Sequence, residues 1–308
     1  MSETVVPADA VPAPVTPPPG AATEAAGFPR PVRLLCVVCG PFFPKAQATH
    51  GDFATLVAAG LRQAGVPPDA VALTAIDIRA GDVLPPATDG AFDAVVFSGS
   101  VPDVDDSPFV LKACDWIRAH VLAARDAPHG MPMLGLCYGH QLLAAALPGG
   151  AVGDLAEGEF GTVDATPTEA ANDDPLWRRV VAGIEGGDGP AAAPADDAAA
   201  VAVASPTTPV HCCHNQTVTR LPHGATSLLR SEKEPHHLVR FAPLTYGTQF
   251  HPEFTHEFLT AAAAEFPPSF DDDARRRFVA SLRPTPLAQR VLRAFVELVA
   301  DRVTATKA

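Results

Sequence analysis

The sequence predicts an α/β fold in which an open, mostly parallel sheet is covered by helices on both faces. Two observations carry this prediction. Short, continuously apolar runs of strand length alternate with helical patterns, and the runs end in turn residues. Strands buried on both faces lack the polar–apolar alternation of a half-exposed sheet. Such sheets place their sites at the carboxyl ends of the strands.

The elements of the first half follow one another in regular order. Leu34–Cys39 is a continuous apolar run of strand length, and Val71–Ile78 is a second one. Between them, residues 52–64 carry apolar side chains at helical spacing until Gly65 and Pro67 end the pattern. We expect the next elements, in chain order, to be a strand at 92–97, a helix at 109–124, a strand at 132–136 and a helix at 139–146.

The second half is less regular. After Val210 the apolar segments shorten and resemble hairpins up to Phe250. A final helix is predicted at residues 287–303, because apolar side chains again recur at helical spacing and Pro286 suits a helix start.

Two segments lack the large side chains that a packed core needs. Residues 1–30 are rich in Pro and Ala, and residues 185–209 are rich in Ala, Gly, Asp and Pro. Such segments cannot offset their ordering entropy, so we expect a disordered tail over 1–30 and a mobile insertion over 185–209. The insertion interrupts one domain, residues 31–262, and residues 263–308 are expected to form a C-terminal helical extension.

Composition limits the classes of partner and compartment. The chain has a net charge of −13 and no stripe of Lys and Arg that could follow a phosphate backbone or an anionic membrane. The N-terminus lacks the features of a signal or transit peptide, and no apolar stretch is long enough to span a bilayer. We therefore expect a soluble, cytoplasmic protein that binds neither nucleic acid nor a membrane.

The six cysteines do not suggest a disulfide scaffold in a chain of 308 residues. Cys36 and Cys39 have the C-x-x-C spacing of redox sites, but they lie in an apolar strand. Residues three apart on a strand point to opposite faces, which suits neither a disulfide nor a shared metal ion. Both are expected to be buried and reduced, as in an intracellular protein.

The strongest chemical signal is Cys137, in the run Gly135-Leu-Cys-Tyr-Gly139 between a strand and a helix. Glycines on both sides allow the sharp turn of a nucleophile elbow, which projects a side chain above the sheet. The thiol would lie at a helix N-terminus, which favours the thiolate, and the N–H of Tyr138 would point at an oxyanion. Taken alone, the turn also suits a buried cysteine without chemistry, because free cysteine is among the most buried residue types.

A base for this thiol is predicted at His251-Pro-Glu253. Residues two apart on an extended chain project to the same side, and Pro252 biases His251 towards that conformation. Glu253 would then orient the imidazole while His251 takes the proton of the thiol.

Two other runs have a predicted role near the site. Gly99 and Ser100 follow a strand, and their backbone N–H groups would form the second half of an oxyanion hole. The run His211-Cys-Cys-His214 contains zinc-ligand types, but adjacent side chains on a strand face opposite ways and no second ligand pair with finger-like spacing follows. We expect a strand leading to the substrate rim, with no metal and no cofactor.

With these blocks in order, the chain resembles the class I (triad) glutamine amidotransferase family over about residues 31–259. The run from Gly135 to Leu143 resembles its G-x-C-x-G-x-Q signature, and the run from Gly247 to Phe254 resembles its second signature. The resemblance implies a flavodoxin-like version of the α/β fold and a γ-glutamyl carbonyl as the target. The residues that it implies are the triad Cys137, His251 and Glu253, the oxyanion amides of Tyr138, Gly99 and Ser100, and Gln141 as a substrate ligand.

This chain departs from the family pattern at two places. The strand-end turn, often Gly-Gly-Pro in the family, is Gly99-Ser-Val-Pro102 here, a mild change because a backbone amide needs no particular side chain. The block that often contains Ser-His-x-Asp is Cys213-His-Asn-Gln216, which leaves recognition of the substrate amine unassigned.

Three functions follow from the resemblance. The Ser98-Gly-Ser100 turn and the residues after it look most like a stand-alone branch that includes the γ-glutamyl peptidases, so hydrolysis of a γ-glutamyl peptide or glutathione conjugate comes first. The alternative is a glutaminase subunit: only 54 residues (308 − 254) follow Phe254, too few for a synthetase domain, so an ammonia acceptor would be a separate protein. A catalytically silent binding or regulatory protein is third, and the intact triad argues against it.

Overall fold

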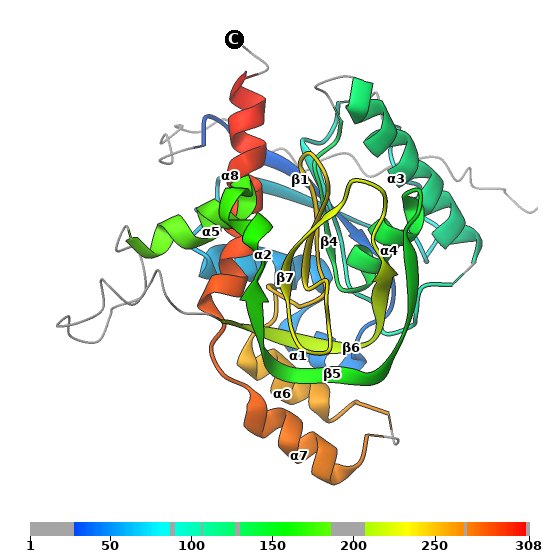
Figure 1. Ribbon diagram of the computed structural model, residues 1–308, viewed down its shortest axis with the longest axis vertical. Coiled ribbons are helices and arrows are strands. Elements are labelled where there is room, and N and C mark those ends of the chain that lie inside the picture. The colour runs from blue at the N-terminus through cyan, green and yellow to red at the C-terminus, as the bar shows by residue number, and fades with distance from the viewer. Residues whose placement is uncertain are drawn as a thin grey trace, which may run out of the picture.

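In the part of the chain that the structure describes, the fold is built on one nine-stranded mixed sheet with the order β2-β1-β3-β4-β9-β8-β7-β5-β6 (Figure 1). The structure, a computed structural model, describes residues 28–86, 90–105, 107–126, 130–185, 207–267 and 270–305. Two predicted segments lie mostly outside these ranges. Residues 1–27 of the tail predicted at 1–30 are not described, and neither are residues 186–206 of the insertion predicted at 185–209.

The first half of the sheet is parallel, as the sequence predicts. It contains β2 (Val71–Asp77), β1 (Val32–Val38), β3 (Ala94–Phe97), β4 (Met133–Leu136) and β9 (Thr245–Thr248). Every residue of β3, β4 and β9 is buried, which explains their unbroken apolar runs. The predicted α/β class with helices on both faces is confirmed.

The second half of the sheet is antiparallel. It contains β8 (Leu238–Ala242), β7 (Thr226–Arg230), β5 (Ala151–Pro167) and β6 (Thr208–Arg220). The long β5–β6 pair, with an irregularity between Asp154 and Glu159, curves across the front of the molecule in Figure 1. Hairpin-like segments after Val210 agree with the expectation, whereas β5 was not predicted.

Helices cover both faces of the parallel half. One face packs against α2 (Phe53–Gln63) and α8 (Pro286–Ala305), and α5 (Pro175–Glu185) lies against α8. The other face packs against α3 (Pro108–Asp126) and α4 (Tyr138–Ala146). Asp52 starts α2, where its side chain accepts a hydrogen bond from the N–H of Thr55 at 2.9 Å.

The two cysteines of the C-x-x-C run lie on opposite faces of the sheet, as expected. Cys36 belongs to the core under α2 and α8, whereas Cys39 belongs to the core under α3 and α4. Both are buried and carry free thiols. Burial raises the pKa of the Cys36 thiol to about 12, which disfavours redox chemistry there.

A third cluster, of aromatic side chains, lies at one end of the sheet. It packs α1 (Pro44–His50), α6 (His256–Ala263) and α7 (Asp272–Ser281) together. The phenylalanines of this cluster are Phe42, Phe43, Phe53, Phe254, Phe258, Phe266 and Phe278. A short 3₁₀ helix, Glu169–Asp173, lies elsewhere and precedes α5. The helices α1, α6 and α7 form the lower end of the molecule in Figure 1. The sequence did not predict α1 and α6, whereas α7 lies within the helical extension expected over 263–308.

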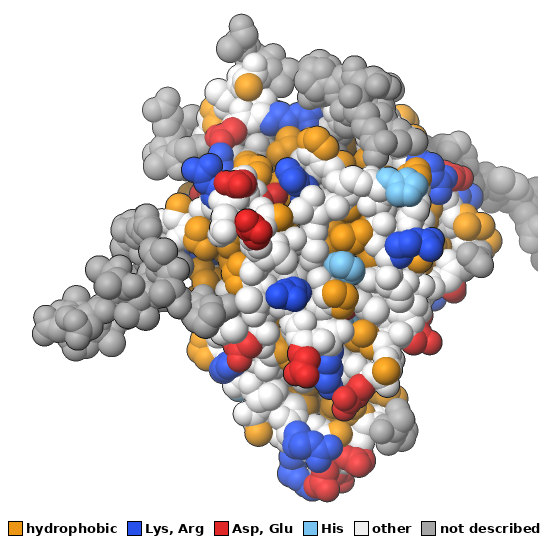
Figure 2. Space-filling model, in the orientation of Figure 1, with side chains coloured by type: hydrophobic (Ala, Val, Ile, Leu, Met, Phe, Trp, Pro, Cys, Tyr) orange, Lys and Arg blue, Asp and Glu red, His pale blue; other side chains and the backbone are white. Residues whose placement is uncertain are grey.

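On the face in Figure 2, basic and acidic side chains lie among one another. At the tip formed by α7, for example, Arg275 pairs with Asp272 and Arg276 pairs with Asp273. Among the described residues, no helix is both long and apolar enough to cross a membrane.

Candidate active site

Cys137 occupies the single residue between β4 and α4, as the predicted elbow requires. Its backbone has φ 49° and ψ −98°, one of two positive φ values among the described residues other than glycine. The N–H of Cys137 donates to the carbonyl of Thr248 at 2.7 Å, so β9 fixes the turn from its neighbouring position. The thiol therefore lies at the N-terminus of α4 and at the carboxyl end of two parallel strands.

The glycines beside Cys137 are required by close backbone contact. A Cβ on Gly139 would lie 2.4 Å from the carbonyl oxygen of Phe97, and one on Gly135 would lie 2.4 Å from the carbonyl carbon of Gly139. Since β-carbons do not approach backbone so closely, α4 can pack this tightly on β3 and β4 only with glycine at both positions.

His251 and Glu253 lie next to Cys137 beyond the end of β9. The Nδ1 atom of His251 is 2.7 Å from Oε1 of Glu253, and both residues are buried. Because the carboxylate accepts, Nδ1 donates, which leaves Nε2 as the atom for proton exchange. The ring is held in place by stacking on Phe254, at a centroid distance of 3.9 Å, and by a hydrogen bond from its backbone N–H to the carbonyl of His211 at 2.9 Å.

The electrostatics of the pair favour a charged imidazole. Burial alone would lower the pKa of His251, but the Glu253 carboxylate and the Cys137 thiol group raise it to about 9. At neutral pH, His251 is therefore protonated and able to give a proton to a leaving group. A second cysteine in the cavity, Cys213, is a poor nucleophile, because burial raises the pKa of its thiol to about 12.

The predicted oxyanion donors lie around this group. Gly99 lies against the imidazole, since a Cβ there would be 3.0 Å from Cε1 of His251. Ser100 lines the cavity, and Tyr138 is the first residue of α4. Within the described part of the chain, the backbone N–H groups of these three residues make no recorded hydrogen bond, which leaves them available to an incoming oxygen.

Gln141 belongs to a chain of glutamine side chains. Its Nε2 donates to the backbone carbonyl of Gln216 at 2.8 Å and to Oε1 of Gln249 at 3.1 Å. Nε2 of Gln249 in turn lies 3.5 Å from the thiol sulfur of Cys137. Sequence reasoning missed Gln249, although it lies two residues before His251, the same spacing that joins His251 to Glu253.

Gln216, at the position where the family often has Asp, joins two elements at the rim of the cavity. The Oε1 atom of Gln216 accepts from the N–H of Val104 at 3.1 Å, and its Nε2 lies 3.4 Å from Oδ1 of Asp154. Gln216 therefore links the strand-end loop after β3 to β5 at the rim of the cavity.

Cys137 and His251 open into a cavity of about 380 Å³. Gln141 and Gln216 supply polar lining, and much of the remaining wall is aromatic: Phe42, Phe43, Phe160, Phe266 and Phe270. His214 also lines the cavity and belongs to a buried group with Glu159 and Cys212, whose potential ligand atoms lie within 4.8 Å of one another.

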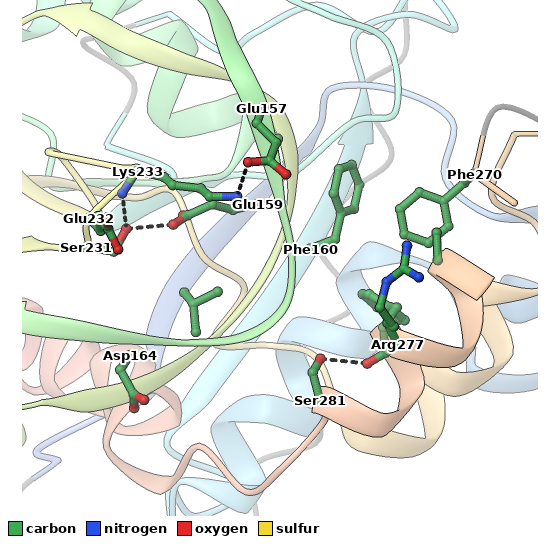
Figure 3. A pocket seen from close by; sticks show the side chains of 14 residues that line it. Glu157, Glu159, Phe160, Asp164, Ser231, Glu232, Lys233, Phe270, Arg277 and Ser281 are labelled. Carbon is green, nitrogen blue, oxygen red and sulfur yellow. Dashed lines mark hydrogen bonds and ion pairs between the residues drawn. The ribbon is translucent and has the colours of Figure 1, made fainter. Parts of the chain in front are cut away.

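A second, larger cavity of about 660 Å³ lies beside the first, between β5 and α7 (Figure 3). Phe160 and Phe270 line both cavities, and their rings lie side by side with centroids 5.0 Å apart. The second cavity contains two cationic side chains. Lys233 pairs with Glu157 at 2.7 Å, whereas Arg277 has no acidic partner among the described residues.

Comparison with known proteins relates this geometry to a family. The family model described as glutamine amidotransferase class-I matches residues 50–263. The glutamine-hydrolysing GMP synthase of Aeropyrum pernix is 32% identical over 206 residues, which cover 67% of this chain and 32% of that protein. The enzyme of the same name from Shewanella amazonensis is 30% identical over 128 residues, 41% of this chain and 21% of that protein. The chain thus spans only about a fifth to a third of the length of these relatives.

Solved structures share the fold. A glutamine amidotransferase from Thermotoga maritima superposes with a TM-score of 0.60 at 18% identity, covering 88% of this chain and 98% of that one. A glutamine amidotransferase from Methylobacillus flagellatus gives a TM-score of 0.54 at 22% identity, covering 90% and 94%. At these identities the likeness supports the architecture alone.

Proposed function

Since this chain belongs to the class I glutamine amidotransferase family, we propose that it hydrolyses a γ-glutamyl amide through a thioester on Cys137. The observation that carries the proposal is the position of the Cys137 thiol beside His251, with Glu253 on the far side of the imidazole. A nucleophile, a base and an orienting carboxylate in one line are the parts that acyl transfer needs.

The reaction follows from the positions of these groups. The Cys137 thiolate attacks the γ-carbonyl carbon, and the N–H groups of Tyr138, Gly99 and Ser100 receive the oxyanion. The carbon–nitrogen bond then breaks while His251 gives its proton to the departing amine. Water next attacks the thioester as His251 takes a proton from the water. The carbon–sulfur bond breaks, which releases glutamate and restores the Cys137 thiolate beside a protonated His251.

The shape of the cavity supports an amine larger than ammonia. A volume of about 380 Å³ lies within the range of about 300–1,000 Å³ that takes drug-sized ligands. Ammonia would gain nothing from a wall of five phenylalanines, whereas a peptide or an apolar conjugate would bury surface against it. We infer a γ-glutamyl peptide or conjugate as the substrate.

The neighbouring cavity offers a place for the far end of such a substrate. A peptide amine that leaves past Phe160 and Phe270 would bring its carboxylate towards Arg277. An arginine without an acidic partner among the described residues is suited to a carboxylate, because its guanidinium can donate two parallel hydrogen bonds.

A second candidate is the release of ammonia from glutamine for a separate synthetase in the cytoplasm. The observation that favours it is the similarity to GMP synthases described as glutamine-hydrolysing, of which this chain matches only a part. In this case the protein alone should turn glutamine over slowly, and a partner protein should accelerate it.

The two functions are separated by assaying the purified chain alone. Glutamine, glutathione and S-substituted glutathiones are offered, and released glutamate is measured. We expect kcat/KM for a conjugate to exceed that for glutamine by at least about tenfold, a difference of about 1.4 kcal/mol in transition-state binding. Glutamine turnover that appears only with a partner would favour the second candidate.

The mechanism itself is tested with two cysteine variants. Cys137→Ala should abolish release of glutamate from every substrate, whereas Cys114→Ala, which removes a thiol from α3, should retain it. Equal turnover by wild type and Cys137→Ala would rule out the thioester route.

A further inference from the structure

A buried group of four side chains borders the proposed catalytic cavity, which one of them, His214, also lines. Glu159 comes from β5, Cys212 and His214 come from β6, and His237 directly precedes β8. All four are at least 95% buried. Oε2 of Glu159 lies 3.4 Å from Nε2 of His214 and 3.1 Å from Nε2 of His237, so one carboxylate oxygen meets two imidazole nitrogens.

The three facing atoms are without hydrogen-bond partners. Among the described residues, Oε2 of Glu159 and the Nε2 atoms of His214 and His237 make no hydrogen bond of acceptable geometry. Buried polar atoms are normally satisfied, so three that face one another call for an explanation. A cation between them would accept a lone pair from each.

Two further atoms, one on His214 and one on Glu159, are held as metal ligands usually are. Nδ1 of His214 lies 3.0 Å from the carbonyl oxygen of Gln216, and because a carbonyl can only accept, Nδ1 carries the proton. Oε1 of Glu159 accepts from Oγ of Ser231 at 2.6 Å (Figure 3). Such outer hydrogen bonds leave the lone pairs of Nε2 and Oε2 directed at a common point.

Cys212 completes the group. Its sulfur and the ligand atoms of Glu159 and His214 lie within 4.8 Å of one another. Tetrahedral ligands at zinc–ligand distances of about 2.0–2.3 Å are about 3.3–3.8 Å apart. The separations of 3.4 and 3.1 Å between Oε2 of Glu159 and the two Nε2 atoms lie near this range. Cys212 and His214 are two apart on β6 and so share a face. Glu159 lies opposite His214 on the neighbouring strand β5, and His237 comes from the segment just before β8.

We propose that Glu159, Cys212 and His214 bind a zinc ion with a structural role, and that Nε2 of His237, which contacts Oε2 of Glu159 but lies outside the 4.8 Å group, turns towards the ion as the fourth ligand. One carboxylate, one thiolate and two imidazoles form a four-ligand set with no open position, which is typical of structural rather than catalytic zinc. This departs from the sequence prediction of no metal, which considered ligands within the run 211–214 alone.

The position of the ion gives it a consequence for the active site. The carbonyl of His237 accepts from the N–H of Gln249, whose side chain contacts Cys137. The carbonyl of His211, on β6, accepts from the N–H of His251. Zinc would therefore join the backbone segments that hold both Gln249 and His251 in place.

Metal content is the direct test. The full chain, made without a histidine tag in zinc-supplemented culture and purified without chelator, should contain about one zinc per chain by elemental analysis. Glu159→Gln and His237→Asn should lose most of it, whereas His223→Asn, on an exposed turn, should keep it. Wild-type protein with less than a tenth of an equivalent after incubation with zinc, or cluster variants with undiminished zinc, would overturn the proposal.

Cobalt tests the coordination in protein that is folded. The chain expressed with cobalt in place of zinc should show the visible bands of tetrahedral cobalt and a near-ultraviolet band from thiolate-to-cobalt charge transfer. Cys212→Ser, verified as folded by circular dichroism, should lose the charge-transfer band. Retention of that band in Cys212→Ser, or its absence in cobalt-containing wild type, would refute this ligand set.

Discussion

Replacing Glu253 with Gln should shift the alkaline limb of the pH–rate profile to lower pH. In the wild type the Glu253 carboxylate, 2.7 Å from Nδ1, and the neighbouring Cys137 raise the pKa of His251 to about 9 against the effect of burial. His251 must be protonated to release the amine, so kcat/KM should fall as the pH rises through that value.

The size of the shift follows from the lost contact. A hydrogen bond to a charged group contributes about 1.5–3 kcal/mol, and one pKa unit corresponds to about 1.36 kcal/mol, so a neutral amide should lower the pKa of His251 by about one to two units. The alkaline limb should therefore move from pH about 9 to pH about 7–8.

The assay is kcat/KM for a γ-glutamyl substrate between pH 6 and pH 10.5, about a pH unit beyond each expected limb. Glu257→Gln is the matched control, since Glu257 is exposed on α6 and does not contact His251. An alkaline limb that stays near pH 9 in folded Glu253→Gln, or an equal shift in the control, would refute the assignment of Glu253.

Three further predictions concern other parts of the molecule. Gly99→Ala places a Cβ 3.0 Å from the His251 ring, so kcat should fall by about 10²-fold with little change in melting temperature; unchanged kcat would contradict the close fit. Arg277→Gln should raise KM for γ-glutamyl peptides with a free carboxylate and leave glutamine kinetics unaltered, and an equal rise for both would remove Arg277 from recognition. Burial opposes ionisation of Asp93, but Arg30 and Arg33 hold the pKa of that carboxyl well below its usual value. The ionised carboxyl therefore stabilises the folded state above pH 3.8, and this contribution is lost as the pH falls further. The melting temperature of wild type should therefore fall more steeply than that of Asp93→Asn in acid; parallel curves would contradict this linkage.

The features that the sequence predicts best are those determined by short, local patterns of residues. The parallel strands appear as unbroken apolar runs because both faces are buried. The proposed nucleophile is marked by the glycines around Cys137, and its base by the His251–Glu253 spacing, since each pattern reports a local geometry.

The features that sequence missed depend on distant contacts or mixed surfaces. Glu159 on β5 and His237 just before β8 meet across the sheet although β7 lies between the two strands, and no local spacing links them. The strand β5 is largely half-exposed and contains three glycines, so its residues show no unbroken apolar run. The helices α1 and α6 are only seven and eight residues long, too short for a clear periodic pattern.

The backbone angles of Cys137 have a consequence for how the chain evolves. A residue other than glycine at φ 49° and ψ −98° costs about 1–3 kcal/mol, a sizeable share of a net stability of about 5–15 kcal/mol. Cys137→Gly should therefore melt at a higher temperature than Cys137→Ala, although neither has a thiol. Selection for folding alone would favour glycine at this position, so a cysteine here is what selection for the proposed reaction would keep, and a lineage that ceased to need the chemistry would gain stability by losing it.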